Sequence, residues 1–238
     1  MTNSLNSIFH QDGAVIIKNQ FDQATCLDMI GAYEEIKKNS KSNPSLRDKR
    51  FYFGPLPGIL GEIYRHQDLV DLMEALFGGE NLCLYMKRLL IKDSLFDGDV
   101  SLHQDMPYFS GAQKKISVLI PLNTMNRANG GLVYLKGSHK YGMLQRGTIR
   151  LENFKKFEEL NCDAEIGDIV VSDFLTWHYS VPAISKVERP LLQLVYQPSS
   201  DGSYGSSKLG VESPTLVRGR WLTDFFAPWG ESVLPDSL

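Results

Sequence analysis

The later two thirds of the chain contain five short apolar runs rich in β-branched residues, and these runs limit the possible folds more than any other feature. Clusters of Gly, Pro, Asn and Asp separate them, as is typical of strands joined by turns. The predicted strands are Leu82–Lys92, Ile116–Leu122, Gly131–Gly137, Asp168–Phe174 and Pro190–Pro198. Many short strands in succession indicate a β-sandwich or a jelly roll.

The first third of the chain has helical patterns instead. Asp22 can cap a helix that starts at Gln23, and this helix should fade in the polar stretch Lys37–Lys41. A second helical region is predicted from Ile59 to Phe77, because Gly78-Gly79 supplies the residues that a helix C-terminus favours. We therefore predict a mainly β protein with flanking helices (α+β), in which N-terminal helices accompany a jelly-roll core.

Two shorter segments complete this assignment. The β-branched run Gly13–Lys18 precedes the first helix and is predicted to be a strand. Phe51–Gly58 (FYFGPLPG) lies between the two helical regions, and its prolines and glycines predict a loop.

Composition is that of an ordinary globular protein. A chain of 238 residues with 42% hydrophobic and 22% charged residues suits one domain spanning residues 1–238. A formal net charge of −3 gives no electrostatic reason to expect nucleic acid or membrane as a partner. We expect a cytoplasmic protein, because no secretory signal pattern begins the chain. The sparse cysteines predict reduced thiols: Cys26, Cys83 and Cys162.

The tripeptide His103-Gln104-Asp105 and the later His178 are candidate metal ligands. Two imidazoles and one carboxylate can occupy one triangular face of an octahedral ferrous ion and leave three positions free. Residues two apart on a strand share a face but diverge, so His103 and Asp105 could share one ion only if the backbone bends there. A solvated strand end is the plainer interpretation of a lone His-x-Asp pair.

Arg189 follows His178 by eleven residues and begins a hydrophobic strand. An unpaired cation there would be costly, whereas a carboxylate ligand held by the guanidinium fork would remove the cost. The alternative is a partly exposed arginine paired near Glu188. An iron site with a carboxylate clamp indicates a 2-oxoglutarate-dependent oxygenase.

Several spaced motifs together resemble the phytanoyl-CoA dioxygenase family, which includes ectoine hydroxylase and other small-molecule hydroxylases. The segments that carry the resemblance are LHQDMPYF (102–109), NGGLVYLKGSHKYG (129–142), Gly167-Asp168, His178 with Arg189, and the opening GAVIIKNQFDQATCLDMI. The resemblance runs from about Phe9 to Gln197 and implies a double-stranded β-helix (cupin-like) core.

The resemblance also implies roles for individual residues. His103, Asp105 and His178 would bind Fe(II), and Arg189 would bind the distal carboxylate of 2-oxoglutarate, with O₂ as the second cosubstrate. Some relatives place a polar side chain on the strand before the His-x-Asp motif to hold this cosubstrate. The positions that could match here are mostly apolar, and the register is open: Met86, Leu90 and Lys92, with Lys87 or Lys92 as possible substitutes.

The implied reaction is hydroxylation of a C–H bond in a small metabolite or biosynthetic intermediate, with release of succinate and CO₂. Desaturation, epimerisation or cyclisation would use the same ligands. A non-catalytic metal-binding or regulatory jelly-roll protein is the alternative from another class, and loss of a ligand would indicate it. The cluster of Arg146, Arg150, Lys155 and Lys156 is interpreted as a solvated loop rather than a cradle for a coenzyme A phosphate.

Aromatic residues near the motif are candidate substrate contacts, although aromatic residues are more often part of a core. The candidates are Tyr108, Phe109 and the Phe51–Phe53 cluster. Ser199–Ser213, which contains Tyr204, has the composition of a loop and could be either a lid over the substrate or a plain connection.

The remaining polar and aromatic residues receive structural interpretations. His139 is expected to hydrogen-bond the adjacent Gly-Ser turn, and His10 and His66 are expected at the surface. Trp177 is expected to pack beside His178, and Asp173 is either an acceptor near the metal site or the end of a strand.

Overall fold

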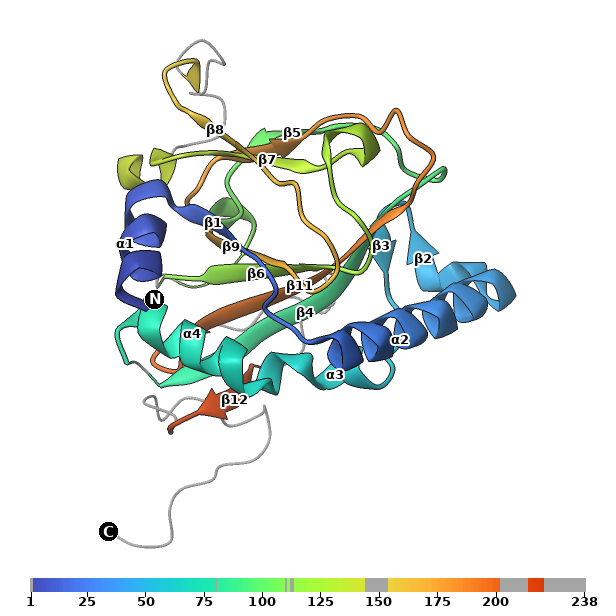
Figure 1. The fold of residues 1–238 in the computed structure, drawn as a ribbon, viewed down its shortest axis with the longest axis horizontal. Coiled ribbons are helices and arrows are strands. Elements are labelled where there is room, and N and C mark those ends of the chain that lie inside the picture. Colours follow the sequence, from blue (N-terminus) through green and yellow to red (C-terminus); the bar gives the residue numbers. More distant parts are fainter. Residues whose placement is uncertain are drawn as a thin grey trace, which may run out of the picture.

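The computed structural model describes residues 2–79, 81–109, 111, 114–143, 154–201 and 214–220. Its centre consists of two antiparallel β-sheets that lie face to face (Figure 1). The larger sheet has the order β1-β9-β6-β11-β4-β3-β2, and β12 also pairs with β4. The smaller sheet has the order β5-β10-β7-β8. This arrangement confirms the predicted jelly-roll core.

The strands of the larger sheet are β1 (Ala14–Ile17), β2 (Arg47–Asp48), β3 (Phe51–Tyr52), β4 (Leu82–Lys92), β6 (Ile116–Pro121), β9 (Ile169–Asp173), β11 (Arg189–Pro198) and β12 (Thr215–Arg218). Those of the smaller sheet are β5 (Val100–His103), β7 (Leu132–Leu135), β8 (Glu159–Asn161) and β10 (His178–Ser180). The α-helices are α1 (Thr2–Asp12), α2 (Gln23–Ser42), α3 (Ile59–Glu62) and α4 (Gln67–Phe77). Short 3₁₀ turns lie at Pro44–Leu46, Ile63–Arg65, Met106–Tyr108, Arg127–Asn129 and Ser138–Tyr141.

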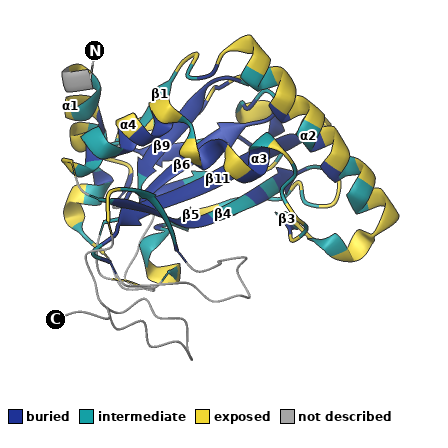
Figure 2. Ribbon diagram, turned by 90° about the horizontal axis from the view of Figure 1, so that it is seen from below, coloured by how far each residue is buried: buried dark blue, intermediate teal, exposed yellow. Residues whose placement is uncertain are grey.

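Helices cover the outer face of the larger sheet, and their exposed sides point away from it (Figure 2). The principal hydrophobic core fills the space between these two layers. Met29 and Ile36 of α2 and Met73 of α4 are fully buried there with residues of β4, β6, β9 and β11. None of the helices in the described part of the chain is long and apolar enough to cross a membrane.

Strand β11 is buried along its whole length because both of its faces are covered. Leu192 and Leu194 belong to the core under the helices. Their neighbours Leu191 and Gln193 line a cavity between the two sheets. The alternation of a strand therefore sends one set of side chains to the core and the other to the cavity.

The helix boundaries follow local signals with two exceptions. Asp22 caps α2 by accepting a 2.8 Å hydrogen bond from the backbone N–H of Thr25, and Gly78 ends α4 with φ +80°. The predicted fading of α2 at Lys37–Lys41 is wrong, because the helix continues to Ser42. The second helical region is interrupted at His66, which separates the turn Ile63–Arg65 from α4.

Other elements also differ from the sequence expectation, since the short strands β2, β5, β8, β10 and β12 are not among the predicted ranges. Helix α1 has no counterpart among the predicted elements, because its sequence is mostly polar; Phe9, which is 1% exposed, anchors it to the core. The predicted loop Phe51–Gly58 begins instead as β3, since Phe51 and Tyr52 pair with Leu90 and Leu89 of β4. The remaining predicted strands agree with the structure to within two residues at each end.

Candidate metal centre and its cavity

A cavity of about 430 Å³ lies between the two sheets. Its walls include strands β4, β6 and β11 of the larger sheet and β5, β7 and β10 of the smaller one. A cavity of this size is typical of a small-molecule site, for which roughly 300–1,000 Å³ is usual.

The structure brings together the three predicted metal ligands, His103, Asp105 and His178, in this cavity. Each offers one ligand atom, and these atoms all lie within 4.8 Å of one another. His103 ends β5 and His178 begins β10, and the two residues are direct cross-strand partners. Their ring centroids are 4.3 Å apart, so the pairing of the two strands brings both imidazoles next to each other.

A bend in the backbone allows Asp105 to join the two histidines. Asp105 lies after the end of β5 with helical angles, φ −75° and ψ −37°, and its N–H donates to the carbonyl of Phe174 at 3.1 Å. One carboxylate oxygen then lies 3.6 Å from Nε2 of His103 and 3.9 Å from Nε2 of His178. The bend that the His-x-Asp spacing requires is therefore present.

Hydrogen bonds on the far side of each imidazole set its tautomer. Nδ1 of His103 lies 2.8 Å from the carbonyl oxygen of Ser101, and Nδ1 of His178 lies 3.0 Å from that of Thr176. A carbonyl oxygen only accepts, so each Nδ1 carries the proton. The Nε2 lone pairs therefore face the cavity, as metal-ligating histidines require.

The electrostatics of the three residues suit a cation. Burial works to raise the pKa of Asp105, but the neighbouring His178 and His103 outweigh it and hold this pKa below its usual range. Burial and the adjacent His103 lower the pKa of His178 to about 4. Asp105 is thus an anion and His178 a neutral imidazole at neutral pH, which are the forms that bind metals.

Two residues that the sequence analysis did not single out support this centre. Tyr134 of β7 stacks on His178 with ring centroids 5.0 Å apart. Gln104 is 1% exposed and its amide donates to the carbonyls of Gly142 and Leu175, at 2.9 and 2.7 Å. The middle residue of His103-Gln104-Asp105 therefore ties the motif to two loops. Its position between two predicted ligands was the only available signal.

Arg189 lines the same cavity from the first position of β11. The residue is 6% exposed, and its buried Nε and Nη1 have no hydrogen-bond partner among the residues that the structure describes. Burial, followed by the nearby Arg50, lowers the pKa of Arg189 to about 10. The alternative of a partly exposed arginine paired near Glu188 is wrong, because Glu188 lies 3.1 Å from Lys37 instead. Unpaired buried donors of this kind are costly unless a ligand satisfies them.

Lys92 of β4 lies directly across the sheet from Arg189 and also lines the cavity. Its ammonium donates to the hydroxyl of Ser180 at 3.1 Å and to the carbonyl of Val181 at 2.6 Å. Burial and the nearby Arg189 lower its pKa to about 8. Lys87, the other candidate on this strand, does not line the cavity; its ammonium donates to the carbonyl of Gly61 at 2.8 Å.

Two further arginines line the cavity and were missed by the sequence analysis. Arg88 lies on the same face of β4 as Leu90 and Lys92, so the period of two could have identified it. Arg50 comes from the turn between β2 and β3, and no sequence signal relates it to the distant metal ligands.

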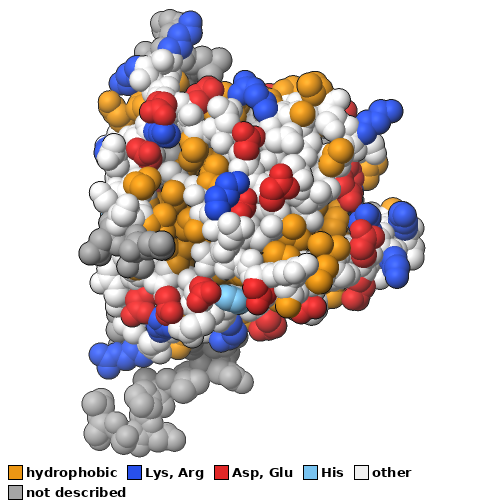
Figure 3. Space-filling view, viewed as in Figure 1, with side chains coloured by type: hydrophobic (Ala, Val, Ile, Leu, Met, Phe, Trp, Pro, Cys, Tyr) orange, Lys and Arg blue, Asp and Glu red, His pale blue; other side chains and the backbone are white. Residues whose placement is uncertain are grey.

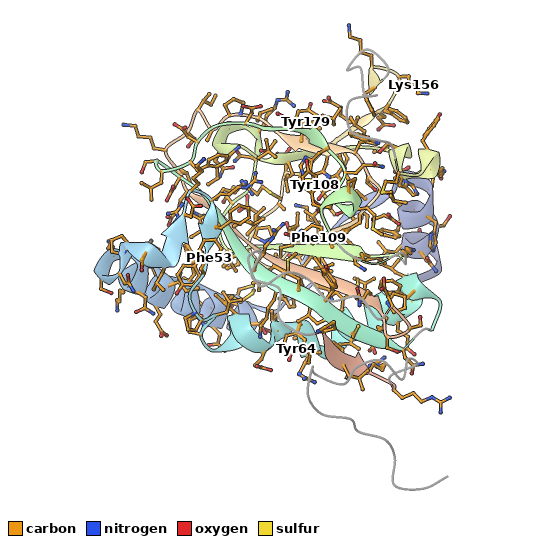
Figure 4. All side chains as sticks on the ribbon, turned by 180° about the vertical axis from the view of Figure 1, so that it is seen from behind. Phe53, Tyr64, Tyr108, Phe109, Lys156 and Tyr179 are labelled. Atoms are coloured by element: carbon orange, nitrogen blue, oxygen red, sulfur yellow. The ribbon has the colours of Figure 1, made fainter. Side chains whose placement is uncertain are left out.

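The predicted substrate contacts fall into two groups. Tyr108, Phe109 and Phe51 line the cavity, whereas Phe53 is 50% exposed and does not. In Figure 4, Tyr108 and Phe109 lie between the two sheets, and Tyr64 lies beyond β4 on the other side of the larger sheet. Tyr204 and most of the candidate lid Ser199–Ser213 lie outside the described residues.

The residues given structural interpretations lie away from the metal centre, with two corrections. Nε2 of His139 lies 3.2 Å from the carbonyl oxygen of His10 on α1, so it contacts this helix rather than the adjacent Gly-Ser turn. His10 is exposed as expected, whereas His66 is half-buried with its ring against Phe21. Trp177 is buried and packs on Phe154, as predicted for a packing residue.

Three other groups behave as structural residues in the described part of the chain. Asp173 ends β9, where its carboxylate accepts a hydrogen bond from the N–H of Leu175. Lys155 and Lys156 are exposed, in agreement with a solvated loop, and Arg146 and Arg150 lie outside the described residues. Cys26, Cys83 and Cys162 are free thiols.

Solved structures with the same fold include several oxygenases. The epimerase SnoN, in complex with Fe³⁺, α-ketoglutarate and nogalamycin RO, is 18% identical with a TM-score of 0.71, and the match covers 93% of this chain and 95% of that one. The carbocyclase SnoK from nogalamycin biosynthesis has a TM-score of 0.71, 16% identity and the same coverage. EctD from S. alaskensis with bound Fe is 17% identical with a TM-score of 0.68, over 92% of this chain and 83% of that one. At these identities the likeness shows the fold.

The sequence of the chain places it in a family. No curated protein matches the chain with significance. The profile of the phytanoyl-CoA dioxygenase (PhyH) family matches residues 9–191, close to the range in which the motifs resemble that family. The chain belongs to the phytanoyl-CoA dioxygenase family of iron- and 2-oxoglutarate-dependent oxygenases.

Proposed function

We propose that this protein is an iron(II)- and 2-oxoglutarate-dependent dioxygenase that hydroxylates a C–H bond of a small metabolite or biosynthetic intermediate. One observation carries the proposal: three residues able to hold a metal ion and a buried guanidinium with unpaired donors share one cavity. A metal site alone would need no such cation, and an anion site alone would need no such ligands.

The donor set fits ferrous iron. His103, Asp105 and His178 offer two neutral imidazole nitrogens and one carboxylate, which is the set of non-haem iron oxygenases that leave positions open for cosubstrates. The bound iron, 2-oxoglutarate and O₂ would supply the oxidising power of the reaction, with succinate and CO₂ as coproducts. The protein's own task is to hold these groups and to position the substrate.

Arg189 fits the distal carboxylate of 2-oxoglutarate. Its Nε and Nη1 are buried without hydrogen-bond partners among the described residues, and a guanidinium can present paired N–H donors to the two oxygens of a carboxylate. Lys92, opposite Arg189 on β4, adds a second cation at this end of the cavity. A dicarboxylate would remove the cost of burying both cations, which supports the weaker prediction that Lys92 contributes to cosubstrate binding.

The remaining wall would position the substrate and limit the access of water. Tyr108 and Phe109 follow Asp105 closely in the chain, and the ring centroid of Tyr108 is 5.9 Å from that of His103. A rigid aromatic wall beside the iron ligands can hold one C–H bond in place, and positioning of this kind contributes strongly to rate. We propose Tyr108 and Phe109 as substrate contacts.

Hydroxylation is one of several reactions that an oxygenase of this class could catalyse. SnoN is an epimerase and SnoK a carbocyclase, so the fold accommodates outcomes other than hydroxylation. Hydroxylation is the simplest outcome, because it needs no second substrate bond near the iron. All three candidate ligands are present, which disfavours the non-catalytic alternative.

Two measurements test the proposal in sequence. Anaerobic addition of 2-oxoglutarate to the Fe(II) protein should give a visible charge-transfer band, because the 2-oxo acid would chelate the metal. Under an atmosphere of ¹⁸O₂, succinate release should then be stimulated by a substrate whose product gains one ¹⁸O atom. Absence of the band in a protein that binds Fe(II) would refute the cosubstrate assignment, and a product without ¹⁸O would refute hydroxylation.

A further inference from the structure

The cavity contains more positive charge than the proposed reaction uses. Among the described residues that line it, four are cationic and one is a carboxylate: Arg50, Arg88, Lys92, Arg189 and Asp105. A ferrous ion and a doubly charged 2-oxoglutarate would cancel each other, so the loaded cavity keeps the same excess. By contrast, acidic and basic side chains are interspersed over the outer face in Figure 3. Such a buried excess attracts anions and is costly without them.

The two arginines not assigned to the cosubstrate are held between aromatic rings. The guanidinium carbon of Arg50 lies 5.0 Å from the ring centroid of Phe51 and 5.6 Å from that of Phe96. That of Arg88 lies 5.4 Å from Phe51 and 5.5 Å from Phe109. Phe51 contacts both guanidiniums, Phe96 contacts that of Arg50 and Phe109 that of Arg88. All five residues line the cavity, and we call them the arginine–aromatic row. Rings that cover a planar guanidinium leave its N–H edge as the available donor surface.

Most donors in this row have no partner in the described part of the chain. The guanidinium of Arg50 makes no hydrogen bond or ion pair there; only its backbone carbonyl is engaged, by the N–H of Ile91. Arg88 donates through Nε to Gln193 at 2.7 Å, and Gln193 in turn donates to Ser117. This chain of hydrogen bonds fixes the orientation of Arg88 while its two terminal nitrogens stay free of partners among the described residues.

We propose that the substrate of this oxygenase is a small organic acid, and that Arg50 and Arg88 of the arginine–aromatic row bind its carboxylate. This inference rests on the proposed function and adds the substrate class to it. Arg88 lies apart from the cosubstrate end of the cavity, because Arg189 and Lys92 pair across the sheet at the first position of β11, whereas Arg88 pairs with Gln193 four residues along. Arg50 is close enough to Arg189 to lower its pKa, so it lies nearer to the cosubstrate end. The row reaches the iron ligands through Tyr108 and Phe109, so a substrate held by its carboxylate extends toward the metal.

The test uses benzoate as the probe and benzamide as its neutral counterpart of similar shape. Both are titrated by calorimetry into the anaerobic complex of the full chain with Fe(II) and 2-oxoglutarate. Benzoate should bind at least about tenfold more tightly than benzamide, because only the carboxylate can satisfy two unpaired guanidinium edges. Equal affinities, or no binding of benzoate, would overturn the proposal.

Variants then identify the residues responsible. Arg50→Gln and Arg88→Gln should each weaken benzoate binding by about tenfold or more and leave benzamide unchanged. Arg127→Gln is the matched control, since this arginine is exposed and contacts Asn161 rather than the cavity. Arg88→Lys, which keeps the charge, provides a second variant if loss of the bond to Gln193 unfolds Arg88→Gln. Benzoate affinity that survives in all three cavity variants would contradict the assignment and would indicate binding at the iron.

Failure of this inference can be separated from failure of the proposed function. The charge-transfer band reports Fe(II) and 2-oxoglutarate alone, and it is measured in the unmodified protein beside the benzoate titration. A normal band without discrimination between benzoate and benzamide refutes the substrate class only. A missing band in the unmodified protein refutes the proposed function.

Discussion

Lys92 and Arg189 are direct partners across strands β4 and β11, so two cations share one end of a cavity whose other groups include the three candidate iron ligands. The two positive charges lie close together and repel each other, and this repulsion contributes to the lowered pKa of Lys92. A bound dicarboxylate would reverse the effect, because it would stabilise the charged form of both side chains.

Arg189→Ala should raise the KM for 2-oxoglutarate by roughly 30-fold or more, since truncating one member of a desolvated charge pair costs about 2–5 kcal/mol. Arg189→Lys should recover only part of the loss, because an ammonium cannot offer two parallel donors. Steady-state kinetics at saturating Fe(II) would measure both changes. An unchanged KM in Arg189→Ala would place the dicarboxylate elsewhere.

His103→Ala or Asp105→Ala should abolish turnover and weaken Fe(II) binding by about tenfold or more, because a site with three protein ligands has no spare one. His139→Ala is the control, since His139 contacts the carbonyl of His10 and does not line the cavity. Metal titration under anaerobic conditions would compare the three variants. A wild-type rate in either ligand variant would refute the assignment.

Binding of 2-oxoglutarate should be accompanied by proton uptake at about pH 8.5. The pKa of Lys92 is about 8 in the cosubstrate-free protein, below the ordinary 10.5, so part of the population is neutral at this pH. Arg189 and Arg50 oppose its protonation and Asp99 and Asp97 favour it, and a bound dicarboxylate would add to the favourable side. Affinity for 2-oxoglutarate should therefore fall as pH rises above about 8.

Calorimetry in two buffers with different ionisation enthalpies would measure this proton uptake directly. Lys92→Met should abolish it, whereas Lys156→Met, which alters an exposed lysine, should not. Equal uptake in the unmodified protein and Lys92→Met would assign the proton to another group.

Gln104→Ala should lower the free energy of unfolding by about 1–3 kcal/mol, because two partly buried carbonyls would lose their donor. Iron affinity should fall less than in the ligand variants, since the ligands themselves remain. Denaturant unfolding of the metal-free protein would measure the change. Gln67→Ala removes a comparable but exposed amide contact and should have little effect, so equal losses in both variants would contradict the anchoring role.

Half of the strands could be predicted from the sequence because their signals are local. Strand β4 agrees with its prediction at both ends, since an apolar run bounded by Asn81 and Asp93 needs no distant information. Helix α1 has no such signal; its position depends on the burial of Phe9 against other elements. Strands β2 and β3 have two residues each, too few for any periodicity.

Some residues of the candidate site could be predicted from the sequence and others could not. His103, Asp105, His178 and Arg189 could be predicted because motif spacing and residue chemistry identify them. Arg50 could not, since only the pairing of β3 with β4 brings its turn over the cavity. Arg88 was missed although the period of two places it on the same face of β4 as Lys92, because the register of this strand was left open.

The two candidate histidine ligands belong to the smaller sheet and Arg189 to the larger one. The separation of the sheets therefore sets the distance between the metal site and the guanidinium. Packed sheets lie roughly 10 Å apart, and dense side-chain packing holds this spacing nearly constant. A 2-oxo acid that binds both the metal and Arg189, as proposed, would therefore span a fixed gap. Acids one methylene shorter or longer, such as oxaloacetate or 2-oxoadipate, cannot reach both ends equally well. If Arg189 binds the distal carboxylate, the length of the cosubstrate would be selected by the separation of the two sheets.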